Sequence, residues 1–208
     1  MQNTHTTPEA DEDRHKARMQ KVAAARARMM ESKTDERGLV IVHTGKGKGK
    51  SSSAFGMIFR AIAHGMPSAV IQFIKGGMST GERDLITTHF SDLCAFHTMG
   101  EGFTWVTQDK IRDIEMARAG WEIAKRYIAD PACRLVLLDE INIALRYGYL
   151  APEEVLEALA AKPADSHVIL TGRNAPDLLI AAADLVTEMT LVKHPFRDGV
   201  KAQPGIEF

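Results

Sequence analysis

The chain has 208 residues, of which 45% are hydrophobic and 25% are charged, a composition typical of an ordinary globular protein. Its 26 basic and 27 acidic side chains give a net charge of -1, so no overall field attracts nucleic acid or an anionic membrane. We expect no transmembrane segment and no signal peptide, because no apolar run approaches roughly 20 residues and the N-terminus is highly charged. Cys94 and Cys133 lie in apolar runs, which favours reduced thiols in a cytoplasmic protein.

Residues 1 to 37 differ in composition from the rest of the chain. Threonine and acidic residues are common up to Asp13, and basic residues are then scattered among alanine and methionine up to Glu31. Because alanine, methionine and arginine favour helix, we predict a disordered start and a basic helix over about residues 13 to 32. This helix is either solvated or folds over a site that binds anions. The remaining residues, 38 to 208, are predicted to form one domain.

From Gly38 onward, short apolar runs alternate with helical patterns, which is typical of βαβ units and of a parallel sheet with helices on both faces. The predicted strands are Leu39 to His43, Ala69 to Ile74, Leu93 to Thr98, Arg134 to Asp139, His167 to Thr171 and Leu185 to Leu191. The clearest predicted helices are Ser51 to His64, Asp109 to Ala129, Pro152 to Ala161 and Pro176 to Ala183. Loops are predicted at residues 76–81 and 100–102, which are rich in glycine.

A glycine-rich segment, Thr44-Gly45-Lys46-Gly47-Lys48-Gly49-Lys50-Ser51, follows the first predicted strand and directly precedes a helix. This order places backbone N–H groups and the positive end of a helix dipole around one anion. Glycine lets the backbone approach phosphate, Lys50 neutralises its oxygens, and Ser51 offers a hydroxyl to Mg²⁺. The strict P-loop pattern requires its first glycine at position 44, where this chain has threonine, so Gly45 leaves the spacing one residue short. We interpret the segment as a phosphate site, and the alternative is a solvated loop.

Two adjacent acids, Asp139 and Glu140, end the apolar run that begins at Leu135. An acid at the carboxyl end of a parallel strand lies on the edge where ligands bind, within reach of Mg²⁺ held by Ser51. Since neighbouring side chains in a strand point to opposite sides, we expect only one of the two acids to bind the metal directly. The alternative for Asp139 is that it caps the next helix.

These residues alone predict a phosphate site but do not identify the reaction of the nucleotide. The chain contains no Asn-Lys-x-Asp segment of the kind that reads guanine, and no residue identifies a phosphate acceptor. Two aromatic residues, Phe103 and Trp105, follow a glycine turn just beyond a predicted strand. If the backbone is extended there, both rings point the same way. They either form an apolar wedge beside the phosphates or belong to the core.

Several segments, taken together and in order, resemble a known family. They are Gly45 to Ser51, Gln72-Phe73-Ile74-Lys75-Gly76, Gly102-Phe103-Thr104-Trp105, Asp139-Glu140, Thr171-Gly172-Arg173, Lys193-His194-Pro195-Phe196 and Ala202 to Phe208. This set resembles the ATP:corrinoid adenosyltransferases of the housekeeping type. The basic N-terminal segment is similar to that of the members named for cobyrinic acid a,c-diamide, in which a similar helix lies over the active site.

The resemblance implies a P-loop NTPase-like α/β fold, a homodimer and a specific reaction. The 5′-deoxyadenosyl group of ATP would move to the cobalt of a reduced corrinoid, cob(I)yrinic acid a,c-diamide or cob(I)alamin, and tripolyphosphate would be released. The reaction would require Mg²⁺ or Mn²⁺, and a reduced flavoprotein would supply the electron. Phe103 and Trp105 match the aromatic residues that displace the lower axial ligand of the corrinoid in this family.

The candidate site residues follow from the motifs and the resemblance together. The nucleotide-binding candidates are Thr44, Gly45, Lys46, Gly47, Lys48, Gly49, Lys50, Ser51, Ser52 and Arg173. The metal-binding candidates are Ser51, Glu140 and Asp139, and the catalytic candidates are Lys50, Lys48, Phe103 and Trp105. For Arg173, a surface salt bridge is the alternative to a contact with phosphate or a corrin side chain.

Two positions depart from the family pattern. Lys46 stands where the family commonly has asparagine, and Ser52-Ser53 replaces a start of the helix that is usually rich in threonine and alanine. An added cation at Lys46 is expected to tighten triphosphate binding and slow its release. The histidines show no metal-ligand spacing and are interpreted as structural. His194 lies inside the segment Lys193-His194-Pro195-Phe196 and is the histidine to test.

Two other functions remain open at the level of sequence. One is a P-loop ATPase or kinase that acts on an unidentified acceptor and releases ADP. The other is a carrier that binds a corrinoid or a nucleotide without turnover. The reaction products distinguish these alternatives from adenosyl transfer.

Overall fold

The computed structural model describes residues 8–74, 80–99 and 110–207, and for residues 8–10 the backbone alone. The chain divides into two compact units, Met1–Glu36 and Arg37–Phe208. Most of the predicted loop at 76–81, and the whole of the one at 100–102, lie outside the described residues. No helix in the described ranges is both long enough and apolar enough to cross a lipid bilayer.

The first unit contains one long helix, α1, Pro8–Glu31. It starts several residues before the predicted position 13, because Pro8 suits the first turn of a helix and the acidic residues after it complement the helix dipole. Arg14 and Asp11 form an exposed ion pair at 2.5 Å, one turn apart. The larger apolar side chains along α1, such as Met19 and Val22, are exposed. Helix propensity and local charge pairs therefore support α1, whose side chains are exposed over residues 11–31.

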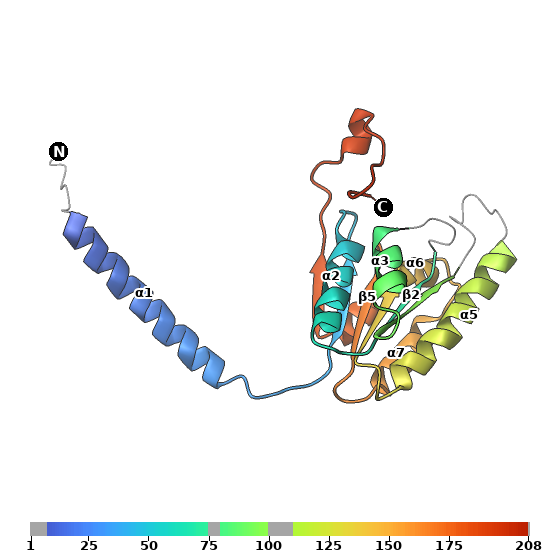
Figure 1. Ribbon diagram of the computed structural model, residues 1–208, viewed down its shortest axis with the longest axis horizontal. Coiled ribbons are helices and arrows are strands. Elements are labelled where there is room, and N and C mark those ends of the chain that lie inside the picture. Colours follow the sequence, from blue (N-terminus) through green and yellow to red (C-terminus); the bar gives the residue numbers. More distant parts are fainter. Residues whose placement is uncertain (1–7, 75–79, 100–109, 208) are drawn as a thin grey trace. The chain divides into compact units, whose positions relative to one another are not determined.

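The second unit contains a six-stranded sheet in which every strand pair is parallel (Figure 1). The strand order is β3-β2-β4-β5-β1-β6. The α/β fold class, with a doubly wound parallel sheet, is thereby confirmed. The strands are β1 Val40–Thr44, β2 Ser68–Gln72, β3 Cys94–Thr98, β4 Leu135–Asp139, β5 His167–Thr171 and β6 Leu185–Glu188.

Helices cover both faces of the sheet (Figure 1). One face carries α2 Lys50–Ala63 and α3 Gly81–His89. The other face carries α5 Lys110–Ala129, α6 Ile141–Arg146, α7 Pro152–Ala160 and α8 Asp177–Ala182. The predicted helices correspond to α1, α2, α5, α7 and α8, whereas α3 and α6 are not among them. Both are short, and α3 buries only Ile86, so neither shows a long apolar period.

The central strands are buried on both faces, and successive residues alternate between two apolar clusters. In β1, Val40 and Val42 belong to the cluster under α5 to α8, whereas Ile41 belongs to the cluster under α2. Burying one such side chain contributes about 1.5–3 kcal/mol. The edge strand β6 is exposed along its length and ends at Glu188, so its predicted extension to Leu191 was wrong. The candidate site is therefore formed by the carboxyl ends of the buried central strands and not by the outer strand β6.

Adjacent strands β1 and β5 send their chains to opposite faces of the sheet. The chain leaving β1 enters α2, and the chain leaving β5 enters α8. Ligands of open parallel sheets bind in the crevice outside the carboxyl ends of the strands at such a switch point. The fold therefore directs attention to the ends of β1, β5 and the next strand, β4.

Burial lowers the pKa of His43, His97 and His167. Since each folded-state pKa lies below the unfolded value of about 6.5, the unfolded chain binds more protons as the pH falls through that value. The free energy of unfolding is therefore expected to decrease between about pH 7.5 and about pH 5.5. Urea unfolding at each pH measures this, and His43→Phe is expected to reduce the slope. Replacement of the exposed His64 by alanine is the control, and an unchanged slope in His43→Phe would contradict the prediction.

Candidate active site

A glycine loop, residues 45–49, connects the buried strand β1 to α2. Gly45 and Gly49 have φ angles of 94° and 101°, a left-handed conformation that favours glycine. A Cβ atom at Gly47 would lie 2.7 Å from the carbonyl oxygen of Met189, which follows β6. The N–H of Gly47 donates to that same oxygen at 2.6 Å. Glycine is therefore required at positions 45, 47 and 49, because the loop turns sharply and packs against the residues that follow β6.

The N-terminus of α2 has no side-chain cap. Its N-cap residue is Gly49, which has no side chain to accept a hydrogen bond from the first turn. Backbone N–H groups in the first turn of a helix have no partner within the helix, and the helix dipole is positive at this end. A phosphate group placed at this end would satisfy these donors.

The three lysines of the segment have different environments. Lys46 and Lys48 are exposed, whereas Lys50 is only 7% exposed. The Lys50 ammonium donates to the carbonyl oxygen of Gly47 at 2.5 Å, so it is held beneath the glycine loop. Buried charges in proteins are paired or hydrogen-bonded, and this contact meets that requirement. Burial and this hydrogen bond therefore fix the position of the Lys50 ammonium group.

The carboxyl end of β4 brings Asp139 and Glu140 to the same edge of the sheet. Asp139 is completely buried, and its two carboxylate oxygens accept hydrogen bonds from Thr171 at 2.7 Å and from Gln72 at 3.0 Å. Glu140 lies just beyond the strand and is partly exposed. Asp139 is therefore built into the sheet, and Glu140 is the acid that reaches the edge.

Two residues near the carboxyl ends of the strands carry oxygen atoms suitable for binding Mg²⁺. Ser51 lies in the first turn of α2, and Glu140 follows β4. The ends of β1 and β4 are separated by β5, so they lie about 10 Å apart, two strand spacings. Mg²⁺ binds one or two protein oxygens and completes its shell with phosphate and water. Within the described part of the chain, no three His, Cys, Asp or Glu side chains form a metal cluster.

The remaining candidate residues lie at other positions along the chain. Ser52 is exposed on the first turn of α2, and Arg173 is exposed after Gly172 at the end of β5. Phe103 and Trp105 lie outside the described residues. His194 accepts a hydrogen bond from the N–H of Phe196 at 3.2 Å and so caps a short 3₁₀ helix, η1, Pro195–Asp198.

Three buried polar residues at this edge, Gln72, Thr171 and Asn142, are not among the site residues predicted from the sequence. Gln72 and Thr171 bind Asp139, and the side-chain amide of Asn142 donates to the carbonyl oxygen of Gly172 at 3.0 Å. A signal was present in the sequence, since each of the first two is a polar residue at the end of an apolar strand. Their partners depend on which strands are neighbours.

A family model described as ATP:corrinoid adenosyltransferase BtuR/CobO/CobP matches residues 36–208. The chain belongs to this family. The resemblance found in the sequence motifs is thereby confirmed, and so is the prediction that the chain is an enzyme.

Relatives of known name support the same assignment. The enzyme is 62% identical to a corrinoid adenosyltransferase of Sinorhizobium sp over 96% of this chain and 94% of the relative. It is 52% identical to a corrinoid adenosyltransferase of Pseudomonas aeruginosa over 97% of this chain and 98% of the relative. It is 43% identical to the corrinoid adenosyltransferase CobA of Salmonella typhimurium over 95% and 99% of the respective chains.

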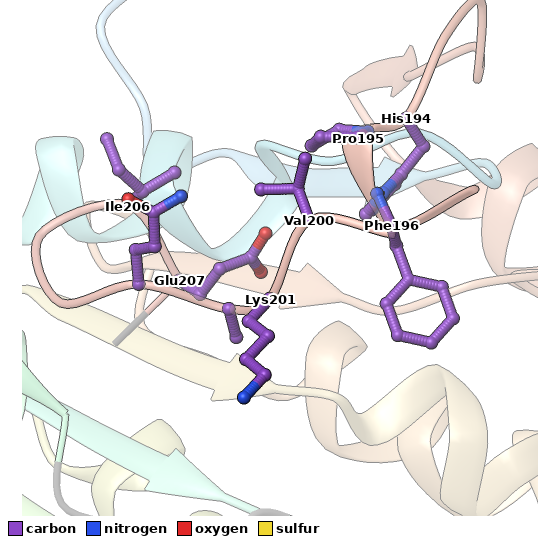
Figure 2. Close-up of a pocket in the computed structure, with 9 residues that line it drawn as sticks. His194, Pro195, Phe196, Val200, Lys201, Ile206 and Glu207 are labelled. Carbon is purple, nitrogen blue, oxygen red and sulfur yellow. The ribbon is translucent and has the colours of Figure 1, made fainter. Parts of the chain in front are cut away.

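The residues after β6, 189–207, form a C-terminal tail. Both the first and the last of these residues contact the glycine loop or the residue before it. At its start, the N–H of Met189 donates to the carbonyl oxygen of Thr44 at 2.9 Å, next to the contact with Gly47 described above. At its end, the Glu207 carboxylate forms an ion pair with Lys48. Figure 2 shows the tail folded around a small cavity whose lining includes Glu207. The carboxylate of Glu207 thus binds a cation that is a candidate for phosphate binding.

Replacement of Glu207 by glutamine is expected to strengthen ATP binding about two- to fivefold at low salt. The substitution removes an anion that competes with phosphate for Lys48, and the modest size reflects the small energies of partly exposed ion pairs. Titration calorimetry at low and high salt measures the effect, which should shrink as salt screens the charges.

Glu154→Gln is the matched control for this experiment. It removes the carboxylate of another exposed ion pair, between Arg118 and Glu154 on α5 and α7, with the same change in net charge. ATP affinity that is equal in Glu207→Gln and in the control would show that the tail carboxylate does not compete with phosphate.

Proposed function

We propose that the enzyme transfers the 5′-deoxyadenosyl group of ATP to the cobalt of a reduced corrinoid and releases tripolyphosphate. The observation that carries this proposal is the glycine loop at the N-terminus of α2, with three lysines in and beside it, in a chain of the ATP:corrinoid adenosyltransferase family. The corrinoid is cob(I)yrinic acid a,c-diamide or cob(I)alamin.

The reaction is a nucleophilic substitution at C5′ of the nucleotide. An electron pair on Co(I) forms the Co–C bond while the bond between C5′ and the α-phosphate oxygen breaks, and the leaving group takes that electron pair. Co(I) is itself a strong nucleophile, so the step needs no protein base. The protein's contribution is to orient the two substrates and to stabilise the negative charge that develops on the triphosphate.

The lysines and the backbone of the glycine loop are the groups that stabilise this leaving group. Lys50, held beneath the loop by the carbonyl oxygen of Gly47, presents a fixed ammonium group. The exposed Lys46 and Lys48 add two further cations in the glycine loop, of which Lys48 is paired with Glu207. Preorganised donors of this kind act where charge develops and need no reorganisation during the reaction.

The donor set at the sheet edge fits a hard divalent cation, Mg²⁺ or Mn²⁺. Ser51 and Glu140 would hold it, and Asp139, whose carboxylate is engaged by Thr171 and Gln72, would orient the end of β4. Bound there, such a cation would neutralise charge on the phosphate oxygens. The nucleotide-binding set is proposed to include Thr44, Gly45, Gly47, Gly49, Ser52 and Arg173 as well.

The corrinoid side of the reaction rests on the family resemblance. Phe103 and Trp105 are proposed to displace the lower axial ligand of cobalt, which stabilises its four-coordinate, lower-valent state. A reduced flavoprotein is proposed as the electron donor, and a cytoplasmic homodimer as the working form. The basic N-terminal unit is proposed to cover the active site of its own chain or of its partner.

Lys50→Ala is expected to lower kcat/KM for adenosylation by about a hundred- to a thousandfold, the usual loss when one preorganised donor to a developing anion is removed. The assay is anaerobic incubation with ATP, Mg²⁺ and chemically reduced cobalamin. It is followed by the light-sensitive absorbance of the Co–C bond and by analysis of phosphate products.

Lys162→Ala is the matched control, because the Lys162 ammonium also donates to a backbone carbonyl beside β1, that of Gly38, but at the opposite end of the strand. Release of ADP by the unmodified enzyme without a corrinoid would support an ATPase or kinase, and binding without any product would support a carrier. Full adenosylation activity in a folded Lys50→Ala variant would exclude the proposed role of the loop.

Phe103→Ala and Trp105→Ala are expected to slow the reaction that starts from Co(II) far more than the reaction that starts from pre-reduced Co(I). Loss of an aromatic side chain lets a lower ligand remain on cobalt, and that ligand disfavours reduction. Rates from both starting states are compared by absorbance, with the exposed aromatic Tyr147 replaced by alanine as the control. Equal losses from the two states would contradict this role.

A further inference from the structure

We propose that Thr171 is a positioning residue that holds Glu140 in the orientation needed to bind the divalent cation. The proposal rests on the function proposed above, in which that cation lies between Ser51 and Glu140. It starts from the backbone of Glu140, which has φ 62° and ψ 18°. This left-handed conformation is unfavourable for a residue with a Cβ atom and persists where surrounding contacts enforce it.

The Thr171 hydroxyl group supplies one of these contacts. Its oxygen accepts a hydrogen bond from the N–H of Glu140 at 2.9 Å and donates its own hydrogen to Asp139 at 2.7 Å. Because the hydroxyl hydrogen points to the Asp139 carboxylate, the oxygen lone pairs are directed to the Glu140 backbone. One hydroxyl group therefore links the buried acid to the backbone of the acid at the edge.

Backbone hydrogen bonds hold the same turn from both sides. The carbonyl oxygen of Asp139 accepts from the N–H of Phe73 at 3.0 Å, and that of Glu140 accepts from the N–H of Ile143 at 3.1 Å. Asp139 also accepts from Gln72, so the chain of hydrogen bonds crosses β2, β4 and β5. Such connected networks polarise each member and restrict the geometry of the group at their end.

The end of β5 is shaped to leave room for the Glu140 side chain. Gly172 has φ 130°, and a Cβ atom there would lie 2.9 Å from the Cβ of Asn142 and 3.3 Å from the Oε2 of Glu140. Asn142 in turn donates to the carbonyl oxygen of Gly172 at 3.0 Å. Thr171 and Gly172 thus act on Glu140 together, the first through its backbone and the second through the space beside its carboxylate.

The strand register shows that this polar layer is not a chance contact. Gln72 pairs with Asp139, and Thr171 pairs with His43. Strands β2, β4 and β5 therefore end in a polar residue on the α2 side of the sheet, and β1 has His43 on that side next to its last residue. All four are at most 3% exposed. Burying polar groups is unfavourable unless hydrogen bonds compensate, and the bonds of Thr171 converge on the two acids of the proposed metal site.

The test is to replace Thr171 by valine, which keeps the shape of the side chain but removes both hydrogen bonds. Mn²⁺ binding to the ATP complex, measured by the loss of the free-ion EPR signal, is expected to weaken about ten- to a hundredfold. ATP binding without metal is expected to change less than about twofold, because the Thr171 hydroxyl bonds to Glu140 and Asp139 and lies on β5 rather than in the glycine loop. Thr171→Ser retains the hydroxyl group and is expected to restore Mn²⁺ affinity to within about threefold of the original.

Ser166→Ala is the matched control, since the Ser166 hydroxyl is also buried and donates to the carbonyl oxygen of Cys133 at 3.0 Å, just before β5 begins. If Thr171→Val does not fold, Thr171→Ala provides the same comparison without the added methyl group. Unchanged Mn²⁺ affinity in a folded variant that lacks the hydroxyl would overturn the proposal. Adenosylation by the unmodified enzyme, measured in parallel, separates this failure from a failure of the proposed function, because a wrong function would abolish that signal too.

Discussion

The parallel direction of all six strands is the constraint on which the candidate site depends. Because the strands run the same way, the residues that follow each apolar run meet at one edge of the sheet. The glycine loop after β1, the acids at the end of β4 and the Thr171-Gly172 segment at the end of β5 are far apart in the chain and meet at this edge, with the end of β5 between the other two. The hydrophobic burial that orders the strands therefore also assembles the polar groups.

Charge at the glycine loop is balanced by the protein in two different ways. Lys50 is buried and is held by a backbone carbonyl, whereas the more exposed Lys48 pairs with Glu207 at the end of the tail. A carboxylate so close to an anion site reduces repulsion among neighbouring cations. Phosphate bound at the loop and the Glu207 carboxylate would interact with the same Lys48 ammonium group. Binding of an anion at the loop is therefore expected to weaken the contact between the tail and Lys48.

Much of the fold could be predicted because each central strand contains a short apolar run bounded by polar or turn residues. β5 has the bounds that its sequence predicts, and α7 starts at the expected proline. The prediction failed where the local pattern is weak: α3 and α6 are short, and β6, which is exposed on the edge of the sheet, ends earlier than its apolar run suggests. In these places packing against the rest of the chain, rather than local periodicity, decides the structure.

The sequence by itself determined the glycine loop, the lysines beside it, the pair of acids after an apolar run and the family to which these motifs belong. Such features are local, because a few consecutive residues specify a turn, a helix start or the end of a strand. Only the tertiary structure decided that Asp139 is enclosed by Gln72 and Thr171, that Glu140 adopts a left-handed backbone and that Glu207 meets Lys48. These contacts join residues distant in the chain, and they depend on the order and register of the strands and on the path of the tail, which hydrophobic periodicity does not specify.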